Sequence, residues 1–174
     1  MNVGGQSIVL VGFMGTGKSS VGRCLENFLG WPVFDTDALL VETLGMPIAE
    51  IFSKLGEERF RTEETSVLER IGPAVPSIIV AGGGAILRPH NIVRLRELGT
   101  VVCLTADLPT LCERLKPVAS RPLLQSENPD ATIERLLRER EPLYEAAADL
   151  TIDTSLLTHA QVAESILESL ALTH

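Results

Sequence analysis

The sequence predicts a three-layer α/β fold, in which helices cover both faces of a five-stranded parallel sheet. Short apolar runs alternate with longer helical stretches along the 174 residues, and strands joined through helices form parallel sheets with right-handed crossovers. A glycine-rich segment, residues 12–19, follows the first apolar run and opens the first helical stretch. Because 45% of the residues are hydrophobic, we expect a single domain over residues 1–174 with a sizeable core.

The strands are predicted from short apolar runs. Five such runs lie at residues 8–11, 31–34, 77–81, 101–104 and 150–152. Glycines or acidic residues directly follow the first three of them: the segment 12–19, then Asp35 and Asp37, then three glycines at 82–84. Open α/β sheets bind ligands at the carboxyl ends of their strands, so these three segments are candidates for a functional site.

The helices are predicted between the strands from the spacing of apolar residues. One face of the first helix carries Val21, Cys24, Leu25 and Phe28. The later helices are expected at residues 38–44, 47–55, 56–71, 91–98, 108–115, 131–148 and 160–170. Gly45 separates the first two of these later helices, and acidic residues in the first turn of the 56–71 helix suit the helix dipole.

Residues 116–129 interrupt this pattern. The segment contains three prolines, several polar residues and Arg121. A loop of this length without regular structure is either disordered or a functional lid.

The segment Gly12-Phe13-Met14-Gly15-Thr16-Gly17-Lys18-Ser19 has the spacing and the strand-to-helix context of a phosphate-binding loop. Its glycines let backbone N–H groups approach phosphate oxygens, and the dipole of the following helix adds positive potential there. We expect Lys18 to reach the β- and γ-phosphates and the Ser19 hydroxyl to ligate Mg²⁺. The alternative, a glycine-rich turn with an accidental lysine, fits the context less well. The sequence therefore predicts a site for a nucleoside triphosphate.

Two further segments are candidates for the same site. Asp35 and Asp37 follow a strand beside the phosphate loop, which favours a functional role over a solvated turn. If the extended conformation continues through them, one side chain faces the metal and the other faces the substrate. The glycines at 82–84 allow a ligand to approach the backbone, or form only a flexible turn. Arg61 lies four residues after Glu57, which a surface ion pair would explain.

Composition limits the partners and the compartment. The formal net charge of −8 argues against nucleic acid, which needs a basic face, and means that an anionic nucleotide requires a local concentration of Lys and Arg. No apolar run approaches the roughly 20 residues that span a bilayer, and the N-terminal segment has no signal-peptide pattern, so no membrane association is expected. Three cysteines without C-x-x-C spacing argue against disulfides and a metal site, and Cys24 and Cys103 are interpreted as core residues. A reduced, cytoplasmic compartment fits best.

Taken together, these segments resemble the shikimate kinases, in the fold group of the nucleoside monophosphate kinases. The matching residues are the phosphate loop, Phe34-Asp35-Thr36-Asp37, Gly56-Glu57, Phe60-Arg61, Glu64, Gly82-Gly83-Gly84, Arg121-Pro122-Leu123-Leu124 and Arg140-Glu141-Pro142-Leu143-Tyr144. They extend from Gly12 to about Asp153 in the order and spacing of the family, and the combination is specific. The resemblance implies the strand order 2-3-1-4-5 and a monomer. It implies transfer of a phosphoryl group from ATP to the 3-hydroxyl of shikimate, which gives shikimate 3-phosphate and ADP.

The resemblance also implies roles at the nucleotide. The nucleotide-binding residues would be Gly15, Thr16, Gly17, Lys18, Ser19, Ser20, Arg114 and Arg121. Arg114 would lie beside adenine, and Arg121 would close with the lid over the phosphates. Asp35 would act with Ser19 near Mg²⁺, through a water molecule. The catalytic residues would be Lys18, Asp37 and Arg121.

At the second substrate, the helices at about 38–71 would form much of the site. The substrate-binding residues would be Asp37, Arg61, Gly82, Gly83, Gly84 and Arg140. Asp37 would hold the reacting hydroxyl and act as the base, and the Gly83 backbone would donate to a ring hydroxyl. Arg61 and Arg140 would clamp the substrate carboxylate, which suits the guanidinium fork, with Glu64 supporting the site. The pocket would then be basic in an acidic protein.

Some positions give weaker signals or depart from the family pattern. Ala81 replaces a leucine often found before the glycines. The third strand has no terminal acidic residue of a Walker B motif, which leaves Ser19 and Asp35 as protein ligands of the metal. The adenine contacts near residues 153–155 have no strong signature. The three histidines, interpreted as surface residues, are His90, His159 and His174.

Two alternatives are weighed against a shikimate kinase. A related kinase could phosphorylate gluconate or a nucleoside monophosphate, although an aromatic content of 4% argues against a nucleotide acceptor. The chain could instead be a non-catalytic nucleotide-binding protein. It lacks the Asn-Lys-x-Asp motif of a GTPase, and a degenerate homologue should have lost Lys18, Asp37 or an arginine of the clamp.

Overall fold

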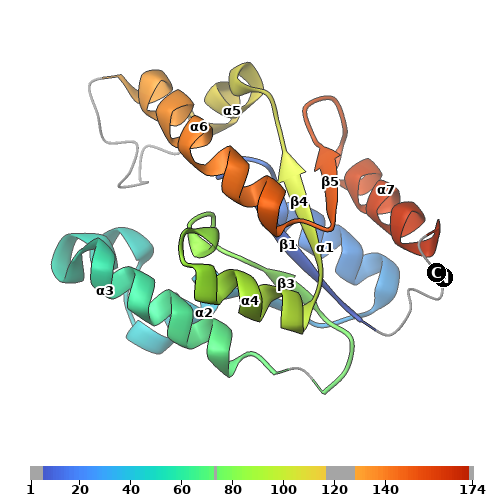
Figure 1. Ribbon diagram of the computed structural model, residues 1–174, viewed down its shortest axis with the longest axis horizontal. Helices are drawn as coiled ribbons and strands as arrows, with labels where there is room; N and C mark the ends of the chain where they lie inside the picture. Colours follow the sequence, from blue (N-terminus) through green and yellow to red (C-terminus); the bar gives the residue numbers. More distant parts are fainter. Residues whose placement is uncertain (1–5, 73, 117–127, 173–174) are drawn as a thin grey trace.

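The core of the protein is a parallel sheet of five strands in the order β2-β3-β1-β4-β5 (Figure 1). The structure is a computed structural model that describes residues 6–72, 74–116 and 128–172. The strands are β1 (Ser7–Gly12), β2 (Val33–Asp35), β3 (Ile78–Val80), β4 (Gly99–Thr105) and β5 (Leu150–Asp153). The predicted fold class and strand order are confirmed, and all strand ends that carry candidate residues lie at one edge of the sheet.

Seven α-helices and one 3-10 helix accompany the strands in the described residues, and the last helix follows the last strand. The bounds are α1 (Lys18–Leu29), α2 (Thr36–Leu44), α3 (Ile48–Arg70), η1 (Ala85–Leu87), α4 (Pro89–Leu98), α5 (Leu108–Leu115), α6 (Pro129–Ala147) and α7 (His159–Leu172). The two helices predicted at 47–55 and 56–71 form α3, which is kinked at Gly56, where φ is 79°. This left-handed conformation suits a residue without a side chain.

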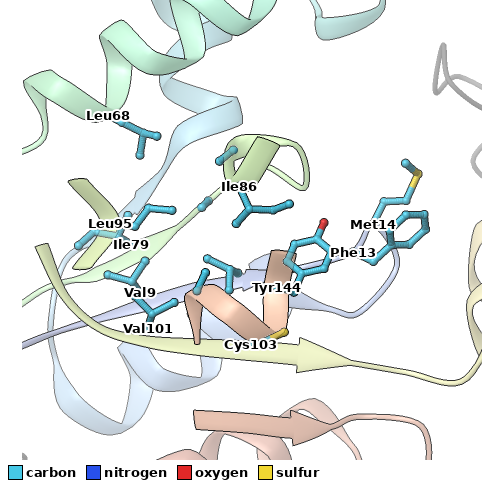
Figure 2. Packing of buried hydrophobic residues seen from close by; sticks show 14 of the residues in the cluster. Val9, Phe13, Met14, Leu68, Ile79, Ile86, Leu95, Val101, Cys103 and Tyr144 are labelled. Carbon is cyan, nitrogen blue, oxygen red and sulfur yellow. The ribbon is translucent and has the colours of Figure 1, made fainter. Parts of the chain in front are cut away.

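Alternate residues of each central strand face opposite layers of helices. Val9 and Val11 of β1 pack into a cluster with side chains of α3, α4 and α6, part of which Figure 2 shows. Ile8 and Leu10 face the opposite side and pack with α1 and α7. This alternation follows from the two-residue repeat of a strand. Figure 1 shows α6 crossing one face of the sheet, with α1 behind it.

Two sequence-based expectations need correction, and a third falls largely outside the described residues. Phe28, predicted on the buried face of α1, is 49% exposed; Leu29 packs against the core there instead. Cys103 is buried as expected, whereas Cys24 is only half-buried, and neither is in a disulfide. The predicted lid at residues 116–129 falls largely on residues 117–127, outside the described residues.

Within the described chain, no helix has the length and apolarity needed to cross a membrane.

Candidate active site

The phosphate loop joins β1 to α1 and is held by its own side chains. Gly15 and Gly17 have φ values of 84° and 91°, which a residue with a side chain rarely adopts. The buried Thr16 hydroxyl donates to the Phe13 carbonyl at 2.8 Å. The Lys18 Nζ donates to the carbonyls of Gly12 and Phe13 at 2.8 and 3.0 Å. The lysine ammonium therefore lies over the loop, where phosphate oxygens would meet it.

A polar pocket opens on this loop at the carboxyl edge of the sheet. Its lining residues are Gly15, Gly17, Lys18, Ser19, Ser20, Asp35, Asp37, Val80, Ala81, Gly83, Arg114 and His159. The pocket brings together most of the residues predicted to bind the nucleotide. Thr16 does not line it, because its side chain is turned into the loop. Arg121 lies outside the described residues, so its predicted role has no structural account.

Arg114 connects the phosphate loop to the segment after β5. Its guanidinium donates to the Gly15 carbonyl at 3.3 Å, and to the hydroxyl and carbonyl of Thr154 at 3.0 and 2.8 Å. The sequence identified Arg114 only through the resemblance, and Thr154 was not singled out as its partner. These contacts fix the arginine at one wall of the pocket.

His159 is a pocket residue that was not predicted from the sequence. It is exposed, as expected for a surface histidine, but it lines the pocket, and its ring lies against Gly17. His90 is also exposed and pairs with Glu69, while His174 lies outside the described residues. One signal in the sequence could have identified His159: it follows the last strand, and open α/β sheets bind ligands beyond the carboxyl ends of their strands.

Asp35 lies between the phosphate loop and α2. Its Oδ2 accepts a hydrogen bond from the Ser19 hydroxyl at 3.0 Å, and its Oδ1 caps α2 by accepting from the backbone of Asp37 and Ala38 at 3.0 and 3.2 Å. The helix begins at Thr36. The expectation that an extended strand turns Asp35 and Asp37 to opposite sides is wrong, because residues two apart in a strand face the same side and because the cap turns the chain into a helix.

The pair of Ser19 and Asp35 fits a magnesium ion. Mg²⁺ prefers oxygen ligands and is usually held by one or two protein groups, with water and phosphate completing its shell. No group of three or more His, Cys, Asp or Glu side chains with metal-binding geometry occurs in the described residues. A hydroxyl and a carboxylate 3.0 Å apart match this open kind of site.

A second pocket adjoins the first, and Asp37 and Gly83 line both. The second pocket is lined by Met14, Asp37, Ile48, Phe52, Phe60, Arg61, Glu64, Gly83, Gly84 and Arg140. It brings Arg61 of α3 and Arg140 of α6 together, although 79 positions separate them in sequence. Both arginines are almost fully buried, with exposures of 6% and 5%. Their joint burial requires an anionic partner or a dense network of acceptors.

Aromatic rings support both arginines. The guanidinium carbon of Arg61 lies 5.0 Å from the ring centre of Phe60 and 6.0 Å from that of Phe52. The guanidinium of Arg140 lies 6.0 Å from the ring of Phe13. A ring face stabilises a cation and restricts its orientation. Phe52 was not predicted from sequence, because nothing in its local pattern shows which side of α3 faces a ligand.

Glu64 is the main partner of Arg61. Arg61 bonds Glu64 Oε2 at 3.0 Å and the more exposed Glu57 at 3.3 Å, so the surface pair expected with Glu57 exists but is the weaker one. Burial raises the pKa of Glu64, against the opposing charge of Arg61. Among the described protein atoms, Glu64 Oε1 and Arg61 Nε have no hydrogen-bond partner. Buried polar atoms rarely stay unpaired, so a ligand hydroxyl would satisfy this carboxylate.

The three glycines after β3 leave space for these charged groups. A side chain at Gly82 would come within 2.6 Å of Asp37 Oδ1 and 2.8 Å of Glu64 Oε1, and one at Gly84 would overlap the Arg61 guanidinium. Gly83 has ordinary space around it, and its carbonyl accepts a hydrogen bond from the Tyr144 hydroxyl. The outer two glycines are required by protein side chains, a reason that the sequence did not reveal.

Gly84→Ala is therefore expected to raise KM for the second substrate at least about tenfold and to leave KM for the nucleotide nearly unchanged. The added methyl group displaces the Arg61 guanidinium, and one charge-assisted hydrogen bond is worth about 1.5–3 kcal/mol. Steady-state kinetics with each substrate varied in turn checks this split. Gly72→Ala is the matched control, since nothing lies within 4 Å of the new side chain. An equal rise in both KM values would contradict the assignment.

Two pockets that meet at Asp37, one of them built on a phosphate-binding loop, place the protein among the P-loop phosphotransferases. Residues 14–171 match the family model for shikimate kinase. A shikimate kinase of Thermodesulfovibrio yellowstonii is 47% identical, with 94% of each chain covered, and that of Geobacter sulfurreducens is 48% identical over 87% of this chain and 83% of its own. A solved shikimate kinase of Acinetobacter baumannii, in complex with shikimate, has a TM-score of 0.94 at 37% identity and covers 99% of this chain and 96% of its own. The chain belongs to the shikimate kinase family.

Proposed function

We propose that the protein transfers the γ-phosphoryl group of ATP to the 3-hydroxyl of shikimate. The observation that carries this proposal is the position of Asp37, which lies in the wall shared by the two pockets. A carboxylate there reaches a hydroxyl in one pocket while that hydroxyl faces the phosphate loop of the other. Family membership and the shikimate-bound relative support shikimate as the acceptor.

In the proposed reaction, Asp37 accepts the proton of the substrate hydroxyl as its oxygen bonds to the γ-phosphorus. The bond from that phosphorus to the bridging oxygen breaks, ADP leaves, and Asp37 passes the proton to solvent. Lys18 stabilises negative charge on the phosphoryl oxygens, because phosphoryl transfer depends on positioning and charge stabilisation. Arg114 holds the wall beside the nucleoside. We also propose that Arg121 contributes positive charge, as the resemblance implies.

Mg²⁺ is proposed as the cofactor. Ser19 and Asp35 would hold it, the carboxylate directly or through water. The ion would neutralise charge on the β- and γ-phosphates when bound. The proposal also takes the protein to be a monomer, as the resemblance to the family implies.

The proposed carboxylate clamp, Arg61 and Arg140, would distinguish shikimate from acceptors that have no carboxylate. Substituting these arginines therefore tests the proposed function. Arg61→Ala or Arg140→Ala is expected to lower kcat/KM for shikimate about ten- to a hundredfold, because each charge-assisted hydrogen bond contributes about 1.5–3 kcal/mol. Lysine should rescue only in part, since it keeps the charge but not the planar fork. Shikimate methyl ester, which lacks the charge, should be a poor substrate of the wild type.

The ratio of kcat/KM for the acid to that for the ester is the decisive measurement. This ratio should shrink in both alanine variants, and Arg59→Ala, an exposed neighbour on α3 paired with Glu63, should keep the wild-type ratio. An unchanged ratio in both clamp variants would remove the chemical support for a carboxylate substrate. A coupled assay of ADP release with shikimate, gluconate and nucleoside monophosphates in parallel then shows which class of acceptor the protein phosphorylates.

A further inference from the structure

A third cavity lies between α6 and the strands β4 and β5. It has a volume of about 260 Å³ and is lined by Phe13, Thr16, Cys103, Leu104, Thr105, Ala106, Leu137, Glu141, Tyr144, Glu145 and Thr151. None of these residues lines the nucleotide pocket or the shikimate pocket. The proposed kinase reaction therefore leaves this cavity without a role.

The inner walls of this cavity are mostly apolar. Phe13, Cys103 and Tyr144 are buried and belong to one core cluster, and all three are labelled in Figure 2. Apolar cavities bind apolar molecules readily: one of about 150 Å³ takes up benzene. A cavity of about 260 Å³ can thus hold an aromatic ring with a short chain attached.

Two carboxylates mark the opening of the cavity. Glu141 and Glu145 are one turn apart on α6, and both line the cavity while remaining exposed to solvent. No lysine, arginine or histidine is among the lining residues in the described part of the chain. The opening thus favours a cation over an anion.

The charge of these carboxylates extends into the cavity. Burial raises the pKa of the Cys103 thiol to about 11; Lys18 opposes this rise, and the negative charges of Glu145 and Glu141 add to it. A thiol at the inner wall thus senses both glutamates. A ligand with a positive group at the opening and an apolar body inside complements both parts.

We propose that this cavity is a second ligand site for a small primary amine. The ammonium group lies between Glu141 and Glu145, and the alkyl or aryl body packs against Phe13 and Tyr144. The site goes beyond the phosphorylation of shikimate, and its occupation does not depend on that reaction.

The walls of the site also connect it to both substrate pockets. The Phe13 carbonyl accepts a hydrogen bond from Lys18, and the Tyr144 hydroxyl donates to the Gly83 carbonyl. Arg140 lies one turn before Tyr144 on α6, above the Phe13 ring. An amine in the cavity therefore contacts the phosphate loop and the helix of the carboxylate clamp at once, while both substrate pockets stay open.

The test is an NMR titration of the whole protein with 2-phenylethylamine, and with 2-phenylethanol and 3-phenylpropionate as neutral and anionic probes. We expect the amine to bind most tightly and the carboxylate most weakly, with shifts at residues of the cavity. Saturating shikimate and ADP should not displace the amine. Equal binding of the three probes, no binding of the amine, or displacement by shikimate or ADP would each overturn the proposal.

Two variants locate the binding. Glu141→Gln combined with Glu145→Gln should weaken the amine about five- to tenfold, to the level of the alcohol, because exposed charge pairs contribute modestly. Glu139→Gln, which removes an exposed carboxylate of α6 that pairs with Arg135 outside the cavity, should bind the amine as the wild type does.

Thr151→Phe places a ring at the exposed edge of the cavity, at a strand position that tolerates aromatic residues. It should abolish amine binding while far-UV circular dichroism stays unchanged, and persistent binding in this folded variant would place the amine elsewhere.

Discussion

Replacing Lys18 with alanine is expected to lower kcat by at least about a hundredfold, the usual effect of removing one charge-stabilising donor from an active site. The Lys18 Nζ lies within 2.8 Å of the Gly12 carbonyl and 3.0 Å of the Phe13 carbonyl. These bonds hold the ammonium at the mouth of the phosphate loop, where charge develops on the transferred phosphoryl group. Lys18 is the only lysine among the described residues that line the pocket, so no second lysine can replace its charge there. The measurement is ADP release at saturating ATP and shikimate.

Lys54→Ala provides the control for this prediction. Lys54 is an exposed lysine of α3 that pairs with Glu50, and its removal should leave kcat unchanged within experimental error. Because Lys18 also bonds two loop carbonyls, thermal unfolding of Lys18→Ala must show that the chain remains folded. A folded Lys18→Ala variant with near wild-type kcat would contradict the role of this loop in phosphoryl transfer.

Local signals made the framework of the fold predictable. The glycines and Lys18 of the phosphate loop lie within eight consecutive residues, and strand, turn and helix signals are read over similarly short windows. The order of the strands is different, because a strand does not encode its neighbour locally. That order came from the resemblance of the whole set of segments to one family, and the sheet confirms it.

The parts that sequence could not provide depend on contacts between distant segments. The partner of Asp35 is Ser19, 16 positions away, and the group that excludes a side chain at Gly84 is Arg61. The glycines at 82–84 looked like a turn or a place for a ligand, whereas two of them make room for charged side chains. His159 looked like any surface histidine until the fold placed it against Gly17.

The second pocket, the proposed shikimate site, also depends on charged residues that come from distant segments. The chain has a net charge of −8, yet Arg61 and Arg140 meet in one pocket with Asp37 and Glu64. Burial is the main cause of the raised pKa of Glu64; both arginines oppose the rise, and the negative charge of Asp37 adds to it. A substrate carboxylate would share the two arginines with Glu64. Removing one partner from such a buried set leaves the others unpaired, so the effects of substitutions here are not additive.

Asp37→Asn is expected to lower kcat by about 10²–10⁴-fold, the range that a general base contributes. Asparagine keeps the size of the side chain and its contacts near Gly82, but it does not accept a proton at neutral pH. KM for ATP should change little, because the phosphate loop is untouched. KM for shikimate should change modestly, since the arginines of the clamp remain. The measurement is kcat and both KM values from coupled ADP release.

Two comparisons isolate the role of Asp37. Glu42→Gln removes an exposed carboxylate of the same helix and should leave kcat unchanged. Asp35→Asn should instead raise the Mg²⁺ concentration needed for half-maximal activity, because Asp35 bonds Ser19 at the proposed metal site. If Asp37→Asn keeps kcat within about threefold of the wild type, Asp37 is not the base. Glu64, the other carboxylate in the same pocket, would then be the next candidate base. Glu64→Gln would be tested for the loss of kcat that removing the base should cause.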